Sequence, residues 1–366
     1  MTPPVVLAHD YLTQRGGGER VALEFTRQFP EAPLLTSVYQ REETFPEFDG
    51  VDVRTSFLNR CKPFRRDPRI AFGFLPAAIR QMPVPEGVLL VSSSGWAHGL
   101  RARGPKIVYC HNPARWLYQP HDYFPTTPSA VRWMLSSVLS PLRWWDRRAA
   151  RTADHYLANS TAVAERIHSA YGVRATVVHP PAGLDSEGVT EAIPGVEPGF
   201  FLTVGRRRGY KNTALVCAAV EQTPGVRLLV VGGSPTDDGE RVTTVRGISD
   251  AQLRWAYANC RAVVAMSHED FGLAPVEGYR FGRPSICLRA GGYLDSGLEG
   301  VATVFVDEES VEALALALAE FDDAAFDPAA IRAHSEKFSR ETFGRRLRET
   351  IAHVHHRKDR GRALQH

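Results

Sequence analysis

The segment VVLAHDYLTQRGGGERVALEF, residues 5–25, joins an apolar run to a helical pattern through a row of glycines. Val5–His9 is short, apolar and rich in valine, which is typical of a strand buried on both faces. After Gly16, Gly17 and Gly18, apolar side chains recur at helical spacing as far as Phe25. The segment therefore predicts a strand, a glycine loop and a helix, the opening unit of a domain built on a parallel sheet.

The same alternation continues outward from this segment. Up to residue 182 the sequence predicts strands at 34–38, 88–91, 106–109, 155–158 and 176–178, and helices at 131–151 and 162–171. Residues 183–199 contain glycine, proline and acidic residues without an apolar period, which is typical of a linker. A second series then predicts strands at 200–204, 227–231, 261–266, 285–288 and 303–306, and helices at 212–222, 250–259, 273–281 and 309–320.

A chain of 366 residues is long enough for two domains. We expect an α/β protein of two Rossmann-like domains, residues 1–182 and 200–335. Residues 336–357 predict a C-terminal helix, for which packing back on the first domain is one arrangement, and residues 358–366 a disordered tail. Since ligands of parallel sheets bind at the carboxyl ends of the strands, the site is expected in a central cleft that both sheets face.

Composition excludes several classes of protein. A net charge of +3 is too small to indicate a nucleic-acid partner. The five cysteines include no C-x-x-C pair, so they indicate reduced thiols rather than a zinc site or a disulfide framework. No apolar run reaches the roughly eighteen residues that span a bilayer, and the amino terminus lacks the pattern of a signal peptide. The expected location is therefore the cytoplasm.

Two stretches of the first domain concentrate basic side chains. The first contains Arg60, Lys62, Arg65, Arg66 and Arg69, and the second contains Arg143, Arg147, Arg148 and Arg151. One interpretation is peripheral contact with the anionic inner face of a membrane, or with a phosphorylated acceptor. The other interpretation is an ordinary solvated surface. The sequence leaves both open.

The strongest local motif is HEDFGLAPVEG, residues 268–278, which follows a predicted strand. Gly272 and Pro275 predict a turn into a helix, so that Glu269 lies on the loop and Glu277 on the helix. An ionised carboxylate can accept hydrogen bonds from two neighbouring hydroxyls of a sugar or a ribose. This motif therefore predicts a binding site for a hydroxyl-rich ligand.

The second motif, VGRRRGYKN, residues 204–212, also follows a strand and opens a helix. Arg206 and Lys211 flank the turn, so their charges converge with the free amides of the helix, an arrangement that suits a diphosphate. The alternative is an exposed basic loop.

Two further motifs follow strands of the first domain. The loop at Gly17 and Gly18 brings backbone amides to the start of a helix, but it lacks the G-x-G-x-x-G spacing and the Walker lysine. Nicotinamide and ATP chemistry are therefore not favoured. His111, in Tyr109-Cys110-His111-Asn112-Pro113, follows a strand in a position that favours a ligand contact over a structural role.

At these motifs the chain resembles the retaining glycosyltransferases of family 4, which have the two-domain GT-B architecture. The resemblance covers most of residues 5–340. It rests on His9-Asp10-Tyr11 with Gly16-Gly17-Gly18, His111-Asn112-Pro113, Ala158-Asn159-Ser160, Gly205-Arg206 with Lys211, and Glu269 to Glu277. The stretch from Glu269 to Gly272, with Pro275, Glu277 and Gly291-Gly292, is most similar to mannosyltransferases that use GDP-mannose.

The resemblance implies a role for each motif. The first domain would be the acceptor side, and the second would bind the nucleotide sugar. Arg206 and Lys211 would hold the diphosphate, Glu277 the ribose and Glu269 the transferred hexose. Phe271, Gly272 and Leu273 would complete the donor site, Gly17 and Gly18 would offer amides near the phosphates or the acceptor, and His111 would touch the donor sugar. His111, Glu269, Arg206 and Lys211 form the expected catalytic set.

The implied reaction is transfer of a hexose, with mannose favoured, from a nucleoside diphosphate sugar to a hydroxyl acceptor with retention of anomeric configuration. The acceptor could be a saccharide, a lipid-linked glycan or a small natural product. No cofactor and no divalent metal are expected, because Arg206 and Lys211 would neutralise the diphosphate. The chain departs from the family at Gly278-Tyr279-Arg280 and Tyr293-Leu294-Asp295, which bears on the identity of the hexose. An epimerase of the same architecture and a catalytically silent nucleotide-sugar-binding module stay open as alternatives.

Overall fold

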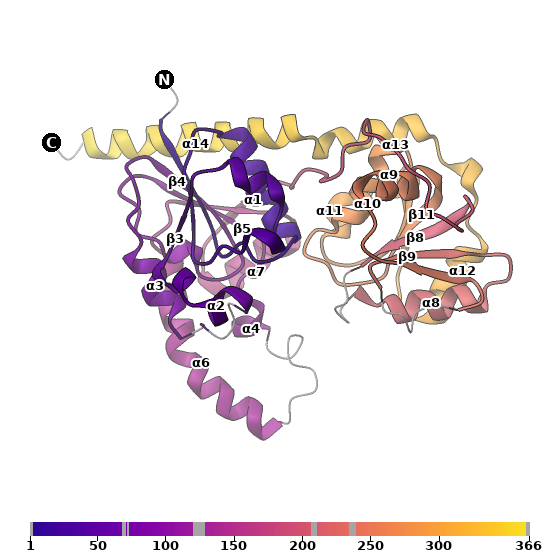
Figure 1. The fold of residues 1–366 in the computed structure, drawn as a ribbon, viewed down its shortest axis with the longest axis horizontal. Coiled ribbons are helices and arrows are strands. Elements are labelled where there is room, and N and C mark those ends of the chain that lie inside the picture. The colour runs from indigo at the N-terminus through magenta and orange to yellow at the C-terminus, as the bar shows by residue number, and fades with distance from the viewer. Residues whose placement is uncertain are drawn as a thin grey trace. The chain divides into compact units, whose positions relative to one another are not determined.

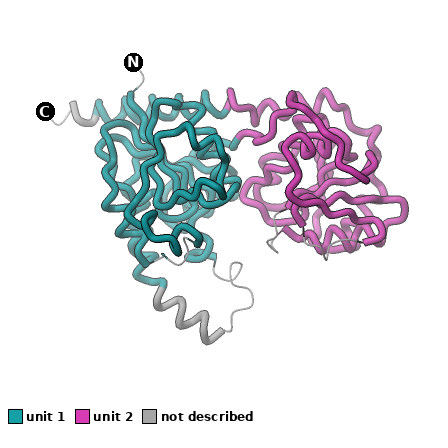
Figure 2. Tube along the Cα trace, in the orientation of Figure 1, with its two compact units in different colours: residues 1–180, 343–366 teal, residues 181–342 magenta. Residues whose placement is uncertain are grey.

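The computed structural model describes residues 3–67, 71, 73–119, 129–205, 211–233 and 239–363. The chain divides into two compact units. Unit 1 comprises Met1–Pro180 and Phe343–His366, and unit 2 comprises Pro181–Thr342 (Figure 2). Each is described here as a body of its own.

Unit 1 is built on a parallel sheet of seven strands in the order β3-β2-β1-β4-β5-β6-β7 (Figure 1). The strands are β1 Val5–His9, β2 Leu34–Thr36, β3 Val53–Thr55, β4 Val88–Ser93, β5 Lys106–Cys110, β6 His155–Ala158 and β7 Ala175–Val177. The central strands are buried on both faces, which explains why their sequences are mainly apolar. The chain runs from β1 outward to β3 and then returns to β4 on the other side of β1, so the topological switch point lies between β1 and β4.

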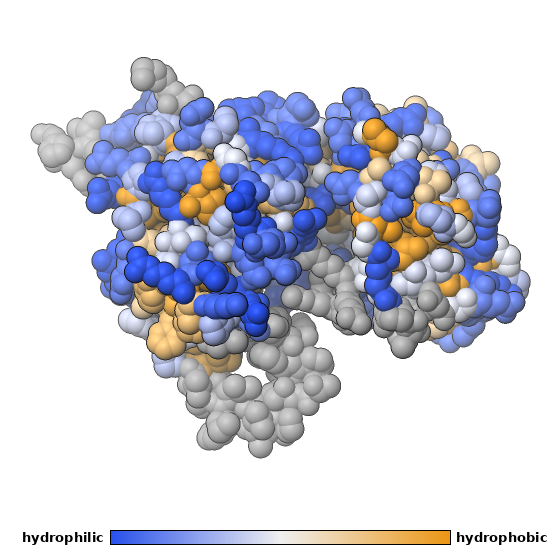
Figure 3. Space-filling view, viewed as in Figure 1, coloured by the Kyte–Doolittle hydropathy of each residue, from blue (hydrophilic) through white to orange (hydrophobic). Residues whose placement is uncertain are grey.

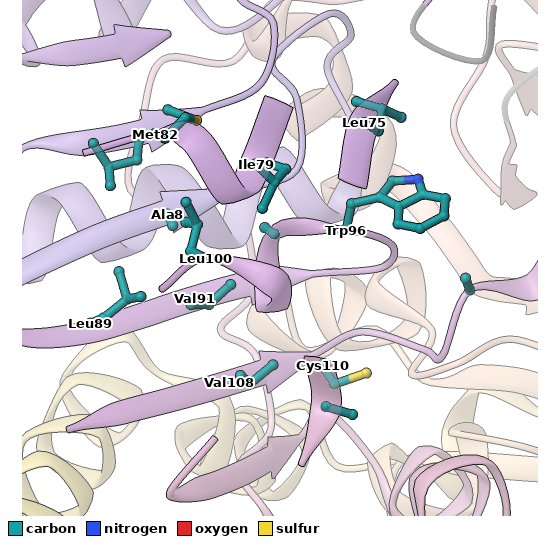
Figure 4. Close-up of a cluster of buried hydrophobic side chains, with 14 of the residues drawn as sticks. Ala8, Leu75, Ile79, Met82, Leu89, Val91, Trp96, Leu100, Val108 and Cys110 are labelled. Carbon is teal, nitrogen blue, oxygen red and sulfur yellow. The ribbon is translucent and has the colours of Figure 1, made fainter. Parts of the chain in front are cut away.

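Helices cover both faces of this sheet. They are α1 Gly17–Gln28, α2 Lys62–Arg66, α3 Leu75–Gln81, α4 Arg115–Tyr118, α6 Ser129–Ala150, α7 Thr161–Tyr171 and α14 Arg340–Ala363, with short 3-10 turns η1 Arg41–Glu43, η2 Pro46–Gly50, η3 Phe57–Arg60 and η5 Ala97–Gly99. One core joins the strands to α3, α6 and α7, and Figure 4 shows part of it, including Val91 and Val108 on the strands and Ile79 on α3. Ser160 caps α7 by accepting from the Val163 amide at 3.2 Å.

The opposite face of the sheet is covered by α1 and the C-terminal helix α14. Phe343, Leu347, Ile351 and Val354 form a buried stripe on α14, and the Phe343 ring stacks on Phe25 at 6.0 Å. The helix therefore does pack on the first sheet. Its bounds differ from the prediction because residues 336–338 form a 3-10 turn (η9) and the helix continues through the expected disordered tail to Ala363.

Unit 2 contains a parallel sheet of six strands in the order β10-β9-β8-β11-β12-β13. The strands are β8 Phe200–Val204, β9 Leu228–Val231, β10 Val242–Val245, β11 Cys260–Ala265, β12 Ser285–Leu288 and β13 Thr303–Val306. The helices are α8 Thr213–Gln222, α9 Asp250–Asn259, α10 Leu273–Arg280, α11 Tyr293–Ser296, α12 Val311–Ala319 and α13 Pro328–Ser335, with a 3-10 turn η8 at Asp323–Ala325. By the same reasoning as in unit 1, the switch point lies between β8 and β11.

Three features of the fold differ from the sequence prediction. The segment 183–199, predicted as a linker, belongs to unit 2, where Leu184 and Ile193 are buried in the core. The strands β3 and β10 were not predicted, because both are short edge strands with polar and charged residues among the apolar ones.

Both units expose hydrophilic as well as hydrophobic residues (Figure 3). On the face shown in Figure 3, hydrophilic residues predominate in unit 1, and a larger hydrophobic area is visible on unit 2. Within the described ranges, every helix is either too short or too polar to cross a bilayer.

Candidate functional site

The switch point of unit 2 brings together a lysine and a glutamate from different loops. Lys211 follows β8, and Glu269 follows β11, the neighbouring strand. Lys211 Nζ lies 2.5 Å from Glu269 Oε1, and the two side chains are 24% and 13% exposed. Because both remain accessible from the carboxyl edge of the sheet, this ion pair presents both a cation and an anion to a ligand at that edge. Arg206, the other predicted cation, lies outside the described residues.

Asn212 joins the two loops that carry this pair. It has a left-handed backbone (φ 50°), and its Nδ2 donates to the Met266 carbonyl at 2.8 Å. The same amide contacts Glu309 Oε1, and the other oxygen of Glu309 lies 3.0 Å from His268 Nε2. These contacts hold Asn212, next to Lys211, against the loop after β11 that carries Glu269.

The backbone around Glu269 is shaped by close packing of glycines. The Gly292 amide donates to the Glu269 carbonyl at 3.0 Å. A Cβ on Gly291 would lie 2.5 Å from that carbonyl oxygen, and one on Gly292 would lie 2.2 Å from Phe271 Cα. Gly272 adopts φ 85° and would clash with the Tyr293 ring if it carried a side chain. Only glycine fits these three positions as the loop stands.

Side chains behind Glu269 support its position. The Ser267 hydroxyl donates to Glu269 Oε1 at 3.3 Å and lies 3.2 Å from the Tyr293 hydroxyl. The Phe271 side chain is buried in the core of unit 2, with its ring 5.7 Å from that of Phe338. Phe271 therefore offers its backbone, rather than its side chain, to a ligand at this edge. Leu273 is the first residue of α10, where backbone amides are not yet bonded within the helix.

Glu277 is held by a tyrosine that the sequence motif does not contain. The Tyr257 hydroxyl, from α9, donates to Glu277 Oε2 at 2.7 Å. Glu277 is 7% exposed and Tyr257 is fully buried, with its ring stacked on Phe281 at 5.6 Å. A hydrogen bond from a rigid buried donor fixes the orientation of the carboxylate. Glu277 is therefore preorganised to accept hydrogen bonds from a ligand.

The switch point of unit 1 carries two histidines bridged by a serine. His9, at the end of β1, lies 2.9 Å through Nδ1 from Ser92 Oγ on β4. The same oxygen lies 2.8 Å from His111 Nε2, after β5. Asn159 donates to the His111 carbonyl at 3.2 Å. Burial, and then the nearby charge of His9, lower the pKa of His111 to about 3, so this ring is neutral near pH 7.

Asp10 clamps the loop after β4. Its carboxylate accepts hydrogen bonds from the Ser93 hydroxyl and from the amides of Ser94, Trp96 and Ala97, at 2.6 to 3.0 Å. Asp10 is 5% exposed. A carboxylate with this many internal donors has a structural function, which is to fix the start of the loop next to the histidines.

The glycine loop of unit 1 lies over the histidines. A Cβ on Gly18 would meet His9 Cε1 at 3.5 Å and the His111 ring at 3.7 Å, which are ordinary contacts. Gly17 is the first residue of α1, so its amide is among those without a partner in the helix. The carboxylate of Glu19 turns back toward Gly16, where a Cβ would lie 2.0 Å from its Oε2. Gly17, Gly18 and His111 therefore lie at one edge of unit 1.

Sequence reasoning missed several residues of these sites. Tyr257 and Glu309 lie far from the motifs along the chain and gave no local signal. Tyr293 stands next to Gly291-Gly292, but its proximity to Ser267 had no signal in the sequence. Ser92 follows an apolar strand pattern, and this position at a strand end was the available signal.

Two family models match the chain, "Glycosyltransferase Family 4" over residues 15–186 and "Glycosyl transferases group 1" over residues 193–324. The chain belongs to glycosyltransferase family 4. The models fall largely on unit 1 and unit 2 respectively, so each contains one of the two switch points.

Curated proteins with named glycosyltransferase activities are similar to the chain at low identity. D-inositol 3-phosphate glycosyltransferase of Mycolicibacterium smegmatis is 28% identical over 220 residues, which are 52% of this chain and 50% of the relative. Alpha-1,3/1,6-mannosyltransferase ALG2 of Homo sapiens is 26% identical over 290 residues, 68% of this chain and 67% of the relative. O-antigen chain mannosyltransferase C of Escherichia coli is 31% identical over 140 residues, 35% of each chain. The matches to the D-inositol 3-phosphate glycosyltransferases span about half the length of those relatives.

Solved structures show the same fold. HepE of Anabaena, in complex with UDP and glucose, superimposes with a TM-score of 0.68 at 17% identity, covering 95% of this chain and 99% of HepE. Sucrose-phosphate synthase from Thermosynechococcus elongatus superimposes with a TM-score of 0.65 at 17% identity, covering 96% and 98%. The family 4 chain therefore has the GT-B fold predicted from its sequence.

Proposed function

We propose that the chain is a retaining glycosyltransferase that transfers a hexose, with mannose favoured, from a nucleoside diphosphate sugar to a hydroxyl acceptor. The observation that carries the proposal is the edge of unit 2, where Lys211, Glu269 and Glu277 lie in the part of the chain that matches the group 1 glycosyl transferase model. Membership of family 4 and the sequence likeness to two named mannosyltransferases support it.

Lys211 is assigned to the diphosphate of the donor. A diphosphate carries more charge than one carboxylate, so it would draw Lys211 Nζ away from Glu269, which lies at 2.5 Å. Glu269 would then be available for hydroxyls of the hexose. Arg206 is the second proposed cation. Since two cations would neutralise the leaving group, the proposed reaction needs neither a divalent metal nor a cofactor.

Glu277 is assigned to the ribose of the donor. Its buried carboxylate, oriented by Tyr257, suits two neighbouring hydroxyl donors. Gly17 and Gly18 would offer amides to the phosphates or the acceptor, and His111 would contact the donor sugar. Gly272 and Leu273 would approach the donor through their backbone.

The proposed chemical step exchanges one bond at the anomeric carbon for another on the same face of the sugar. The bond from the anomeric carbon to the diphosphate oxygen breaks, and the acceptor oxygen bonds to the same carbon. The acceptor's proton passes to the departing diphosphate. The side chains position the reactants and stabilise the developing charge, and neither Glu269 nor Glu277 acts as a base.

The test is to incubate the chain with a panel of nucleotide sugars, with and without candidate saccharide, lipid-linked and small-molecule acceptors. Calorimetry measures binding, mass spectrometry measures transfer, and NMR of the product gives the anomeric configuration. We expect GDP-mannose to bind and to be consumed equally well in EDTA. An inverted product, or binding of UDP-sugars without GDP-mannose, would contradict the corresponding part of the proposal. A donor epimerised without acceptor would indicate an epimerase, and binding without turnover a silent module.

We also propose that unit 1 makes peripheral contact with an anionic membrane at its inner face. Among the described residues of unit 1, the exposed large apolar side chains are Phe57, Phe74 and Trp144, which are aromatic and lie on or beside η3, α3 and α6. Basic residues are frequent in the same stretches of sequence, and Arg148 lies 5.8 Å from the Trp144 ring. In these segments the acidic residues are Asp67 and the buried Asp146. Exposed aromatic rings among arginines suit the boundary between anionic headgroups and acyl chains.

Co-sedimentation with vesicles tests this contact. We expect binding to vesicles that contain phosphatidylglycerol, weaker binding in high salt, and little binding to pure phosphatidylcholine. Trp144→Ser should weaken binding, whereas the matched control Leu316→Ser, at an exposed position of unit 2, should not. Equal binding of both variants would contradict the assigned surface.

A further inference from the structure

The hydroxyl of Ser92 lies between two imidazole nitrogens in the interior of unit 1. It is 2.9 Å from His9 Nδ1 and 2.8 Å from His111 Nε2, and Ser92 itself is fully buried. The His9 and His111 rings are nearly perpendicular, with centroids 6.5 Å apart. Both rings are therefore within hydrogen-bonding distance of the same oxygen atom.

One hydroxyl has one proton to donate, and this restricts the protonation of both rings. A neutral imidazole carries a proton on one nitrogen and a lone pair on the other. If Ser92 donates to His111 Nε2, then the proton of His111 must be on Nδ1. If His111 donates from Nε2, then Nδ1 has the lone pair and can only accept. The direction of the Ser92 hydroxyl thus decides whether His111 offers a donor or an acceptor to a ligand.

The geometry favours donation from Ser92 to His111. His9 Nδ1 lies 2.9 Å from the hydroxyl oxygen, and an N–H at that position donates to this oxygen, which leaves the hydroxyl proton for His111 Nε2 at 2.8 Å. Burial, and then the charge of His9, lower the pKa of His111 to about 3, so its ring is neutral near pH 7 and has a lone pair to accept that proton. The chain of donors then runs from His9 through Ser92 to His111.

We propose that Ser92 is a positioning residue for His111, whose hydroxyl donates to Nε2 and thereby keeps the ring proton on Nδ1. Within the described part of the chain, Nδ1 makes no hydrogen bond, so it is the nitrogen left for a ligand. His111 then donates an N–H to an oxygen of the bound donor, and it does not act as a base. This role rests on the proposed glycosyl transfer, because it assigns His111 to the donor sugar.

The first test measures the tautomer in the substrate-free protein. Long-range ¹H–¹⁵N correlation spectra of histidine-labelled protein distinguish the two tautomers, and His111→Gln identifies the signal. We expect His111 to carry its proton on Nδ1 in the native chain and in Ser92→Thr, which keeps the hydroxyl. Ser92→Ala should lose this preference. A native His111 protonated on Nε2 would overturn the proposal whether or not the chain transfers sugars.

The second test is kinetic and uses a neighbouring serine as the matched control. Ser93 is on the same strand, but its hydroxyl donates to Asp10, which keeps three backbone donors. We expect Ser92→Ala to raise the KM for the donor about three- to tenfold, and Ser93→Ala to leave the KM and the His111 tautomer unchanged. Equal effects of the two variants would show a merely structural role for Ser92. Absence of transfer in the native chain would contradict the proposed function but leave the tautomer result standing.

Discussion

The switch points of the two sheets occupy equivalent places in similar topologies, yet they carry different polar groups. Between β1 and β4 in unit 1 the groups are buried and bonded to one another, with a serine between two histidines and an aspartate among backbone amides. Between β8 and β11 in unit 2 a lysine and a glutamate form an ion pair that is partly exposed. Unit 1 is therefore built for fixed hydrogen bonding, and unit 2 for the exchange of ionic partners with a charged ligand.

The difference arises at the carboxyl ends of the strands and in the loops that follow them. In unit 1, His9 and Ser92 belong to the last residues of buried strands, whereas in unit 2 Lys211 and Glu269 lie on loops beyond the strands. In unit 1 the loop after β4 folds tightly on Asp10, whereas in unit 2 close-packed glycines shape the loop after β11. If unit 2 exchanges ionic partners and unit 1 keeps fixed hydrogen bonds, substitutions at the two edges should differ in the size and kind of their effects.

The ionic character of the unit 2 edge is tested by Lys211→Ala. We expect kcat for glycosyl transfer to fall by about two to three orders of magnitude, because the charge that stabilises the leaving diphosphate is removed. Lys337→Ala, at an exposed position of the same unit, is the control and should retain full activity. Near-normal turnover of Lys211→Ala would remove the lysine from the catalytic set.

The packing of glycines in unit 2 is tested against that in unit 1. Gly292→Ala places a methyl group 2.2 Å from Phe271 Cα, so we expect a loss of about 1–3 kcal/mol in the free energy of unfolding and loss of donor binding. Gly18→Ala places its methyl group at 3.5 Å from the nearest atom and should leave stability unchanged. Calorimetric unfolding and donor titration measure both. A stable, donor-binding Gly292→Ala would show that the loop can move.

The orientation of Glu277 is tested by Tyr257→Phe. This change removes a hydrogen bond to a buried carboxylate and keeps the ring on Phe281. Such a bond contributes about 1.5–3 kcal/mol, so the donor KM should rise about 10- to 100-fold, with kcat nearly unchanged. Steady-state kinetics with the donor varied would show it. A fall in kcat at constant KM would place Glu277 in the chemical step instead.

The buried histidine of unit 1 makes the stability of that unit depend on pH. Its pKa of about 3 lies below the value near 6.5 of the unfolded chain. Between these values the unfolded state binds the extra proton, so stability is greatest above pH 6.5 and falls as the pH drops, by about 1.4 kcal/mol per unit near pH 5. His111→Gln should reduce this dependence of the free energy of unfolding on pH.

Tryptophan fluorescence during urea unfolding measures how the free energy of unfolding changes with pH. Five of the six tryptophans, Trp96, Trp116, Trp133, Trp144 and Trp145, belong to unit 1, so the signal reports mainly on that unit. Trp255 contributes the remainder from unit 2. If the free energy of unfolding of His111→Gln depends on pH as strongly as that of the native chain, then His111 takes up a proton in the folded native chain.

The sequence predicted the elements and motifs that depend on local pattern. The sequence predicted the central strands from their mainly apolar runs, since burial on both faces favours such runs. It also predicted the glycine loop, the positions of Lys211 and Glu269 after strands, and the position of Glu277 on a helix. The edge strands β3 and β10 were not predicted, since an edge strand needs little apolar sequence. The end of α14 was also misjudged, because its polar last turns follow a helix already fixed by the buried stripe at Phe343.

The fold class and the identity of most polar residues at the two switch points could be predicted from the sequence alone. Spacing along the chain carries that information, since strand ends and helix starts are local features. Only the tertiary structure decided which partners fix those residues: Tyr257 for Glu277, Asn212 for the loops around Lys211 and Glu269, and Ser92 for His111. These partners come from elements distant in sequence, and a hydrogen bond of fixed direction exists only when packing places both atoms within about 3 Å.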